Sequence, residues 1–425
     1  MNGTIEAGTS PVVPRHRRLW QSGVLLSAAG FLAGLGNYAF QGLIGRQLDR
    51  AEYGYVNATL SFVGLLSLPL LIASTAITHY IAHFRASGDE TRLQSLLDGC
   101  KKLLLRLTMG GCLLAIVVVK PLSDFFNFPR GSLMLTALLC VLAGLWGAYG
   151  AGLCQGLAWF KRLAAISLLA AALRILFGWV ATRQYAWAEA GVAASGFAVL
   201  SNLVLLYWRN ELRGTGHALS PWTKELGQYL LVGAASVGGG YCFMQGDLLV
   251  AQRYFAGEEL GTYSAAGLLG RALPMVVAPM LTVLFTSRSG HRAGGALREQ
   301  LRLLGLYSAG LGFGVVGLLV LRGFFVVLIF GKPAPEAADM VGAFAVTMAL
   351  VGLIQALGMW ALASRWFKVA LLYGGLGLAY WLVLFALGKT PEAMLRVMPW
   401  SAAAAFVVLF IAWWVAMRTT GREGP

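Results

Sequence analysis

The sequence predicts an all-α polytopic membrane protein of about twelve transmembrane helices, in two pseudo-symmetric six-helix bundles around a central cavity. Of its 425 residues, 58% are hydrophobic and only 12% are charged, and the mean hydropathy is +0.70. Soluble proteins carry about 25% charged residues. A helix needs about 20 residues to cross about 30 Å of hydrocarbon. The chain contains apolar stretches of about this length almost end to end. Little of the chain remains for a soluble domain.

The distribution of positive charge predicts how these helices are oriented. Of the 33 Lys and Arg residues, 21 fall in or close to the two termini and every second connection, and 9 fall in the other connections. This bias predicts that both termini are cytoplasmic, and it explains the net charge of +15 better than a nucleic acid partner would. The first apolar run is longer than the core of a signal peptide, so we expect it to be retained. The expected spans are residues 22–45, 55–84, 103–119, 132–157, 163–181, 187–208, 225–250, 262–287, 303–330, 339–362, 369–388 and 397–417.

An internal repeat predicts two halves. A shift of 207 residues aligns Trp159, Phe160 and Lys161 with Trp366, Phe367 and Lys368, and it also pairs Arg46 with Arg253, Glu52 with Glu259, Gly54 with Gly261, and Arg85 with Arg292. Six helices per half is an even number, so we expect parallel repeats. The expected divisions are a cytoplasmic tail at 1–21, a bundle at 22–208, a cytoplasmic linker at 209–224, a bundle at 225–417 and a cytoplasmic tail at 418–425.

The two halves share a pattern near their first two helices. The first half carries Asn37, Gln41, Arg46, Glu52, Tyr53 and Gly54 before Pro69, and the second carries Asp247, Arg253, Glu258, Glu259, Gly261, Tyr263, Ser264 and Arg271 before Pro274. This pattern resembles the oligosaccharide flippases of the multidrug/oligosaccharidyl-lipid/polysaccharide exporter superfamily. Many of those relatives have further helices at the C-terminus.

The resemblance implies transport of an undecaprenyl-pyrophosphate-linked glycan across the bacterial cytoplasmic (inner) membrane by alternating access, for cell-surface polysaccharide synthesis. It implies this glycan as a partner, with polysaccharide polymerase and chain-length proteins as further candidates. No cofactor is expected, and coupling to protons, sodium or the membrane potential stays open. The basic loops at 85–102 and 288–302 are expected to lie on anionic lipid.

Charged residues within spans are the main candidates for a binding site, because charge in hydrocarbon is costly and usually faces a cavity or a partner. Arg174 and Arg271 lie about 14 to 16 Å deep at the helical rise. A guanidinium remains charged and offers forked donors to phosphate oxygens. The alternative is that each arginine caps carbonyls or pairs with an acid to lock two helices together. Arg322 lies nearer a membrane interface.

The other candidates are polar residues and one acid. We expect Arg271, Arg174, Arg46, Arg253, Asn37, Gln41 and Gln245 to bind substrate, although the amides are as well suited to bonds between helices. Asp247 is expected to form a structural or gating ion pair with Arg46, Arg253 or Arg271, in preference to carrying a coupling proton. No catalytic or metal-binding residues are expected. The cysteines form no CxxC pair, and His79 and His83 suit an interfacial pair better than a metal site.

Helix breakers occur at Pro69, Pro274, Pro279 and Gly238–Gly240. They allow either bending during transport or ordinary kinking and close packing.

Two alternative functions remain. A drug or organic-cation antiporter on the same scaffold is disfavoured because arginines occur where acids would be expected. A membrane enzyme of glycan assembly is disfavoured because the predicted outside loops have about a dozen residues or fewer and carry no recognisable catalytic group.

Overall fold

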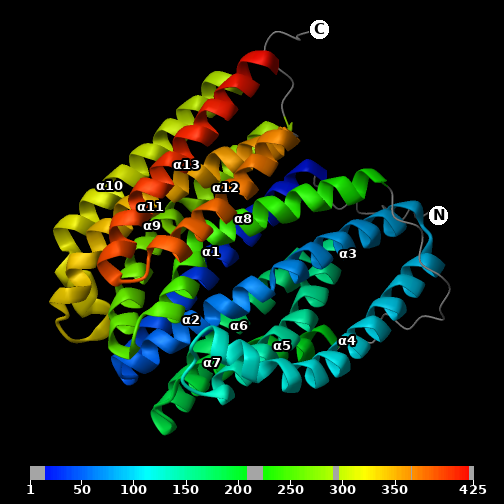
Figure 1. Ribbon diagram of the computed structural model, residues 1–425. Coiled ribbons are helices and arrows are strands. Elements are labelled where there is room, and N and C mark those ends of the chain that lie inside the picture. The colour runs from blue at the N-terminus through cyan, green and yellow to red at the C-terminus, as the bar shows by residue number, and fades with distance from the viewer. Residues whose placement is uncertain (1–14, 208–223, 291–295, 365, 421–425) are drawn as a thin grey trace, which may run out of the picture.

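The structure is a computed structural model that describes residues 15–207, 224–290, 296–364 and 366–420 (Figure 1). Within these ranges it contains thirteen helices and no strand. The helices are α1 (Arg15–Gln47), α2 (Arg50–Leu66), α3 (Leu68–Ser87), α4 (Glu90–Phe125), α5 (Gly131–Gly156), α6 (Phe160–Gln184), α7 (Ala188–Tyr207), α8 (Lys224–Tyr254), α9 (Gly257–Gly290), α10 (Ala296–Phe330), α11 (Pro335–Ala363), α12 (Phe367–Leu387) and α13 (Pro391–Thr420).

The helices α2 and α3 together form one broken membrane span. The break falls at Ser67, and the two helices meet at a bend of 42°. Pro69 occupies the first turn of α3, where its missing N–H costs no helical hydrogen bond. The thirteen helices therefore correspond to the twelve spans that the sequence predicts.

Hydropathy alone recognises only some of these spans. In the described chain, seven helices are long and apolar enough to cross a membrane, and the bent α2 and α3 pair makes an eighth. The helices α1, α8 and α9 have 33, 31 and 34 residues, which is more than the about 20 needed. These three helices also carry most of the polar residues of the site described below.

The helix boundaries repeat with the 207-residue offset. Adding 207 to the first residues of α2 and α6, 50 and 160, gives 257 and 367, where α9 and α12 begin. Adding 207 to the last residues of α1 and α5, 47 and 156, gives 254 and 363, where α8 and α11 end. The packing repeats as well, since α1 packs on α6 and α5 on α7, as α8 packs on α12 and α11 on α13. Two pseudo-symmetric bundles, α1–α7 and α8–α13, follow from this arrangement.

The bundles meet mainly through α2, which contacts α8 and α9. We call the end of the molecule where α1 begins and α13 ends the terminal end, and the opposite end the far end. In Figure 1 the bundles lie close together at the far end, at the lower left, and diverge toward the upper right.

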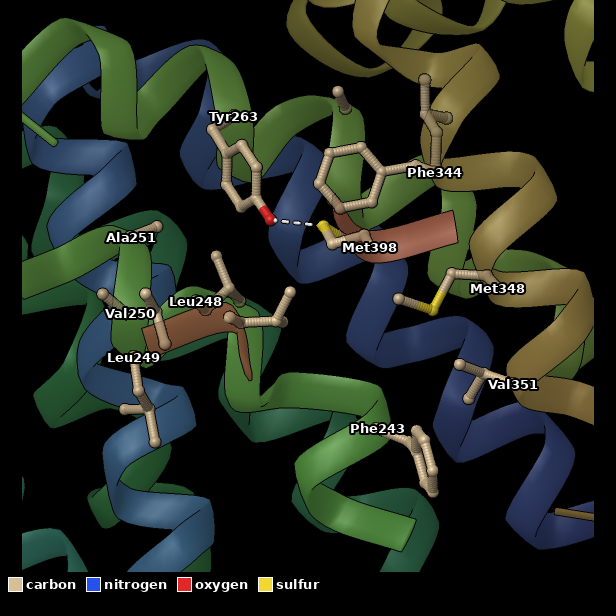
Figure 2. Close-up of a cluster of buried hydrophobic side chains, with 14 of the residues drawn as sticks. Phe243, Leu248, Leu249, Val250, Ala251, Tyr263, Phe344, Met348, Val351 and Met398 are labelled. Carbon is tan, nitrogen blue, oxygen red and sulfur yellow. Dashed lines mark hydrogen bonds between the residues drawn. The ribbon is translucent and has the colours of Figure 1, made fainter. Parts of the chain in front are cut away.

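Each bundle has an apolar interior and an apolar exterior. In the second bundle Tyr263 packs edge-on against Phe344, and its hydroxyl oxygen lies 3.1 Å from Met398 Sδ (Figure 2). On the outside, Val117 of α4 and Phe313 and Val320 of α10 are more than two-thirds exposed. Such faces are stable against lipid tails, which are as apolar as these side chains.

The glycine triplet does not interrupt α8, which is helical from Lys224 to Tyr254. A Cβ at Gly239 would lie 2.5 Å from the Cα of Gly374, so α8 and α12 are in backbone contact here. Of the two interpretations of this triplet, the structure therefore shows close packing.

Candidate functional site

A cavity of about 470 Å³ lies between the two bundles. It is bounded by α1, α2, α6 and α7 on one side and by α8 and α9 on the other. Among the residues that the structure describes, the lining contains two arginines and no Asp or Glu. The polar side chains of the lining are Asn37, Tyr38, Gln41, Asn57, Ser61, Arg174, Ser195, Tyr241, Gln245, Ser264 and Arg271.

Arg174 brings a positive charge to this cavity from α6. Its Nη1 donates to Asn37 Oδ1 at 2.6 Å, and its guanidinium carbon lies 4.5 Å from the ring centroid of Phe40. Its Nε is buried without a hydrogen-bond partner. In the described part of the chain, Arg174 forms no ion pair with a carboxylate. A partly buried charge held only by an amide and a ring is costly, so this guanidinium can still gain from an anionic ligand.

Arg271 also lines the cavity, but its charge is neutralised. Its Nη2 lies 2.6 Å from both Oδ1 and Oδ2 of Asp247, and its Nε donates to the Met244 carbonyl oxygen at 2.7 Å. Asp247 is fully buried, does not line the cavity, and also accepts a bond of 2.9 Å from Tyr263. The sequence analysis named Arg46, Arg253 and Arg271 as possible partners of Asp247. In the structure the partner is Arg271. The pair joins α8 to α9 within one bundle.

The amides Asn37, Gln41 and Gln245, which the sequence analysis named as candidates, line the cavity. Asn37 accepts from Arg174, and Gln245 Oε1 accepts from Ser61 Oγ at 3.1 Å. Gln41 Oε1 is buried with no hydrogen-bond partner, and so are the hydroxyls of Ser195 and Ser264. Because an unpaired buried polar atom costs about 1–3 kcal/mol, these atoms indicate a cavity that receives water or a polar ligand.

Arg46 and Arg253 lie outside this cavity. Both are in the last turn of a helix at the far end. Arg46 donates from Nε to the Ile329 carbonyl oxygen at 3.1 Å and from Nη2 to the Leu328 carbonyl oxygen, so it caps the end of α10. Arg253 donates to Asn127 Oδ1 at 3.0 Å. The structure thus separates these two arginines from the pair that faces the cavity, because arginine in a last helical turn can reach free carbonyls.

No protein-family model and no curated protein sequence matches the chain, whereas solved structures do. An inward-facing multidrug resistance MATE family transporter of the MOP superfamily matches with a TM-score of 0.75 and 14% identity, over 92% of this chain and 96% of that one. The lipid II flippase MurJ, in an inward closed conformation, matches with a TM-score of 0.69 and 11% identity, over 92% of this chain and 87% of that one. The chain has the MOP-superfamily fold. At these identities the likeness describes the arrangement of helices, and it does not single out the oligosaccharide flippases.

A third neighbour has the same MOP fold. It is a MOP superfamily transporter from Pyrococcus furiosus Vc1 (DSM3638), for which a reverse polarity of the binding pocket suggests a different function. It matches with a TM-score of 0.59 and 12% identity, over 95% of this chain and 96% of that one.

The far end of this MOP fold is held by contacts between the bundles. Asn127, in the turn between α4 and α5, donates from Nδ2 to the Arg253 carbonyl oxygen at 2.8 Å, and Gln252 donates to the Asn127 carbonyl oxygen at 3.2 Å. Arg50 of α2 pairs with Glu336 of α11 at 3.1 Å. The cavity is therefore closed toward the far end.

Several cavity residues were missing from the sequence-based candidates, and the repeat could have found them. Asn57 and Ser264 both line the cavity and are 207 residues apart, as are Gly64 and Arg271. The same offset relates four further pairs of lining residues, which are Asn37 and Met244, Tyr38 and Gln245, Gln41 and Leu248, and Ser61 and Leu268. Equivalent faces of α1 and α8, and of α2 and α9, therefore form much of the cavity. The offset does not extend to Arg174, because Trp381, 207 residues further on, is not among the lining residues.

Proposed function

We propose that this chain is a transporter that moves a polyprenyl-pyrophosphate-linked oligosaccharide from the cytoplasmic to the outer leaflet of a bacterial inner membrane. The observation that carries the proposal is Arg174, a partly buried cation without a carboxylate partner in the described chain, in a cavity whose described lining residues include no acid.

The two arginines of the cavity differ in whether their positive charge is already paired. Arg271 already holds Asp247, so the free positive charge of the cavity comes from Arg174. Its Nε lacks a partner, and a phosphate oxygen accepts hydrogen bonds from a guanidinium in a fork geometry. A pyrophosphate would supply the counter-charge that the protein does not.

The remaining polar groups suit the sugar part of such a cargo. Gln41, Ser195 and Ser264 offer buried oxygen atoms without partners, and Asn57 and Gln245 lie beside them in the lining. A glycan presents many hydroxyls that both donate and accept hydrogen bonds, and would satisfy these groups. The polyprenyl tail would stay in lipid while the bundles rock between the two sides.

The structural neighbours give this proposal a precedent on the same fold. MurJ is a lipid II flippase, and the Pyrococcus transporter is described by the reverse polarity of its binding pocket. The fold therefore accommodates more than one class of cargo, so we infer the class of cargo from the charge of the cavity.

The second candidate is a drug or organic-cation antiporter, favoured by the multidrug resistance transporter among the neighbours. A cationic cargo needs a negative group in the cavity. Asp247 is the acid beside this cavity, and it is fully buried behind Arg271. We rank this function second because cation binding would first require that ion pair to break.

Transport by the purified protein in liposomes tests the proposal. We expect it to move a fluorescent polyprenyl-pyrophosphate oligosaccharide between leaflets, and we expect Arg174→Gln to slow this movement about tenfold or more, as loss of a charge-assisted bond does. Arg183→Gln is the matched control, because Arg183 lies on the same helix but contacts Trp179 instead of the cavity. An unchanged rate in Arg174→Gln, or transport of an organic cation in place of the lipid, would reject the proposal.

A further inference from the structure

A groove of about 600 Å³ runs between α12 and α13 in the second bundle. It shares no lining residue with the central cavity. One face of α12, from Leu376 to Leu387, and one face of α13, from Arg396 to Val408, form its two walls. Leu387, Trp400 and Val408 are each more than a third exposed, so the groove opens on the outside of the bundle.

The groove runs from the far end to about the middle of the membrane. The helix α12 ends at Leu387 and α13 begins at Pro391, so both walls start at the far end. At the rise of about 1.5 Å per residue, the walls from Leu376 to Leu387 and from Arg396 to Val408 are about 16 to 18 Å long. The hydrocarbon of a bilayer is about 30 Å thick. The groove therefore has the depth of one leaflet, which is the depth that one acyl chain occupies.

The far-end mouth of the groove is positively charged. Arg396 is the one charged residue among the described lining residues, and it is exposed. In the described ranges it makes no hydrogen bond or ion pair, and neither does Lys389 on the turn between α12 and α13. Glu392 lies one helical turn before Arg396 but forms no ion pair with it. Two positive charges therefore face one negative charge at the mouth.

Trp400 indicates the level of the membrane surface at this groove. It is 79% exposed and lies one helical turn deeper than Arg396. Tryptophan rings favour the boundary between lipid headgroups and hydrocarbon. Arg396 is then level with the headgroups, and its flexible stem lets the guanidinium reach a lipid phosphate. The part of the groove beyond Trp400, toward Ala404 and Val408, lies in hydrocarbon.

We infer that this groove binds one anionic phospholipid from the leaflet at the far end. Its phosphate lies at Arg396, and one of its acyl chains lies along α12 and α13. The two contacts reinforce each other because a single molecule makes both. Both helices belong to the second bundle, so the site is the same whether the bundles are together or apart at the far end. This lipid is distinct from the cargo proposed for the central cavity.

The first test examines the headgroup. Native mass spectrometry of the purified full chain in neutral detergent counts the lipid molecules that remain bound as phosphatidylglycerol or phosphatidylcholine is added. We expect one phosphatidylglycerol to bind more tightly than phosphatidylcholine, whose headgroup has no net charge. Arg396→Gln should weaken its binding about tenfold, as loss of a charge-assisted bond does. Arg183→Gln is the control, because Arg183 is exposed in the last turn of α6 at the far end and contacts Trp179 outside the groove.

The second test examines the acyl chain. Ala404 is exposed within the groove, so Ala404→Leu fills space that the chain would occupy without crowding the bundle interior. We expect this variant to weaken phosphatidylglycerol binding about tenfold, which is the effect of about two buried methylene groups. Ala386→Leu is the control, because Ala386 is exposed on α12 and lies outside the groove. It should bind phosphatidylglycerol as the wild type does.

The inferred lipid uses Arg396 and the groove together, so both variants must lose affinity. Equal affinity for the two lipids, or weakening in only one of Arg396→Gln and Ala404→Leu, would overturn the inference. Equal effects of each variant and its control would do the same. If the wild type is a dimer that Ala404→Leu dissociates, the groove is an interface between two copies of the chain and the lipid site is wrong.

Discussion

Gly54 of α2 and Gly261 of α9 lie in backbone contact where the two bundles cross at the far end. A Cβ on Gly54 would be 2.6 Å from the backbone nitrogen of Gly261, and a Cβ on Gly261 would overlap the carbonyl oxygen of Arg50. The two glycines are 207 residues apart, which is also the offset between the bundles. The pseudo-twofold axis therefore passes close to this crossing, and closure of the far end depends on the absence of two side chains.

We predict that Gly261→Ala opens this crossing. The added methyl group has no space, so α2 and α9 must separate, at a cost of about 1–3 kcal/mol for overpacking. The expected result is a lower unfolding temperature in detergent. Gly312→Ala in α10 is the control, because a Cβ there would meet nothing within 4 Å. Equal unfolding temperatures for the two variants would contradict the close contact.

The buried Asp247 and Arg271 pair should show strong coupling in a double-mutant cycle. We expect Asp247→Asn and Arg271→Gln each to lower the free energy of unfolding by about 3–5 kcal/mol, because each leaves one buried charge without its partner. The double variant should lose less than the sum of the two single changes. The control cycle is Arg322→Gln with Asp339→Asn, a pair with side chains 47% and 74% exposed. Exposed pairs couple by about 1 kcal/mol or less, and the interpretation fails if both cycles give the same coupling energy.

We predict that Asn127→Gly loosens the far end without straining the turn. Asn127 has a φ of 53°, which glycine adopts freely, so this substitution removes the side-chain bonds to Arg253 and keeps the backbone. The reporter is a single cysteine in the cavity, Ser61→Cys, in a background without native cysteines. With a membrane-impermeant thiol reagent added from the far side, this cysteine should react faster in the Asn127→Gly variant than in the parent that keeps Asn127. The matched substitution Asn127→Asp keeps an oxygen that accepts from Arg253. In this variant the reporter cysteine should react more slowly than in Asn127→Gly. Equal reaction rates for the parent and Asn127→Gly would show that these bonds do not hold the far end closed.

Much of the helical architecture could be predicted from the sequence, because apolar runs mark most of the spans and the internal repeat relates the two bundles. The paired motifs at Trp159 and Trp366 lie just before α6 and α12, which begin 207 residues apart. Pro69 marked the break between α2 and α3 for a local reason, since proline costs no hydrogen bond in the first turn of a helix. Pro274 did not mark a break, because α9 continues through it from Gly257 to Gly290. Glycines were less informative, because Gly238–Gly240 indicate close packing or bending equally well in a sequence.

The site was harder to predict because depth in a span does not fix the direction of a side chain. Arg174 and Arg271 are at similar depth, yet one lacks a carboxylate partner in the described chain and the other holds Asp247. That difference depends on the packing of α8 against α9. Arg46 and Arg253 were expected to bind substrate and are paired by the 207-residue offset, but each lies in the last turn of a helix at the far end. Their partners come from distant parts of the chain, which no local pattern shows.

The central claim is that Arg174 gives the cavity a positive charge for an anionic headgroup. The most direct measurement is the affinity of the purified protein for a polyprenyl-pyrophosphate oligosaccharide and for an organic cation, in the wild type and in Arg174→Gln. We predict that the wild type binds the pyrophosphate lipid and that Arg174→Gln weakens this binding about tenfold or more, as loss of a charge-assisted bond does. Preferential binding of the cation, or an unchanged affinity for the lipid in Arg174→Gln, would contradict the claim.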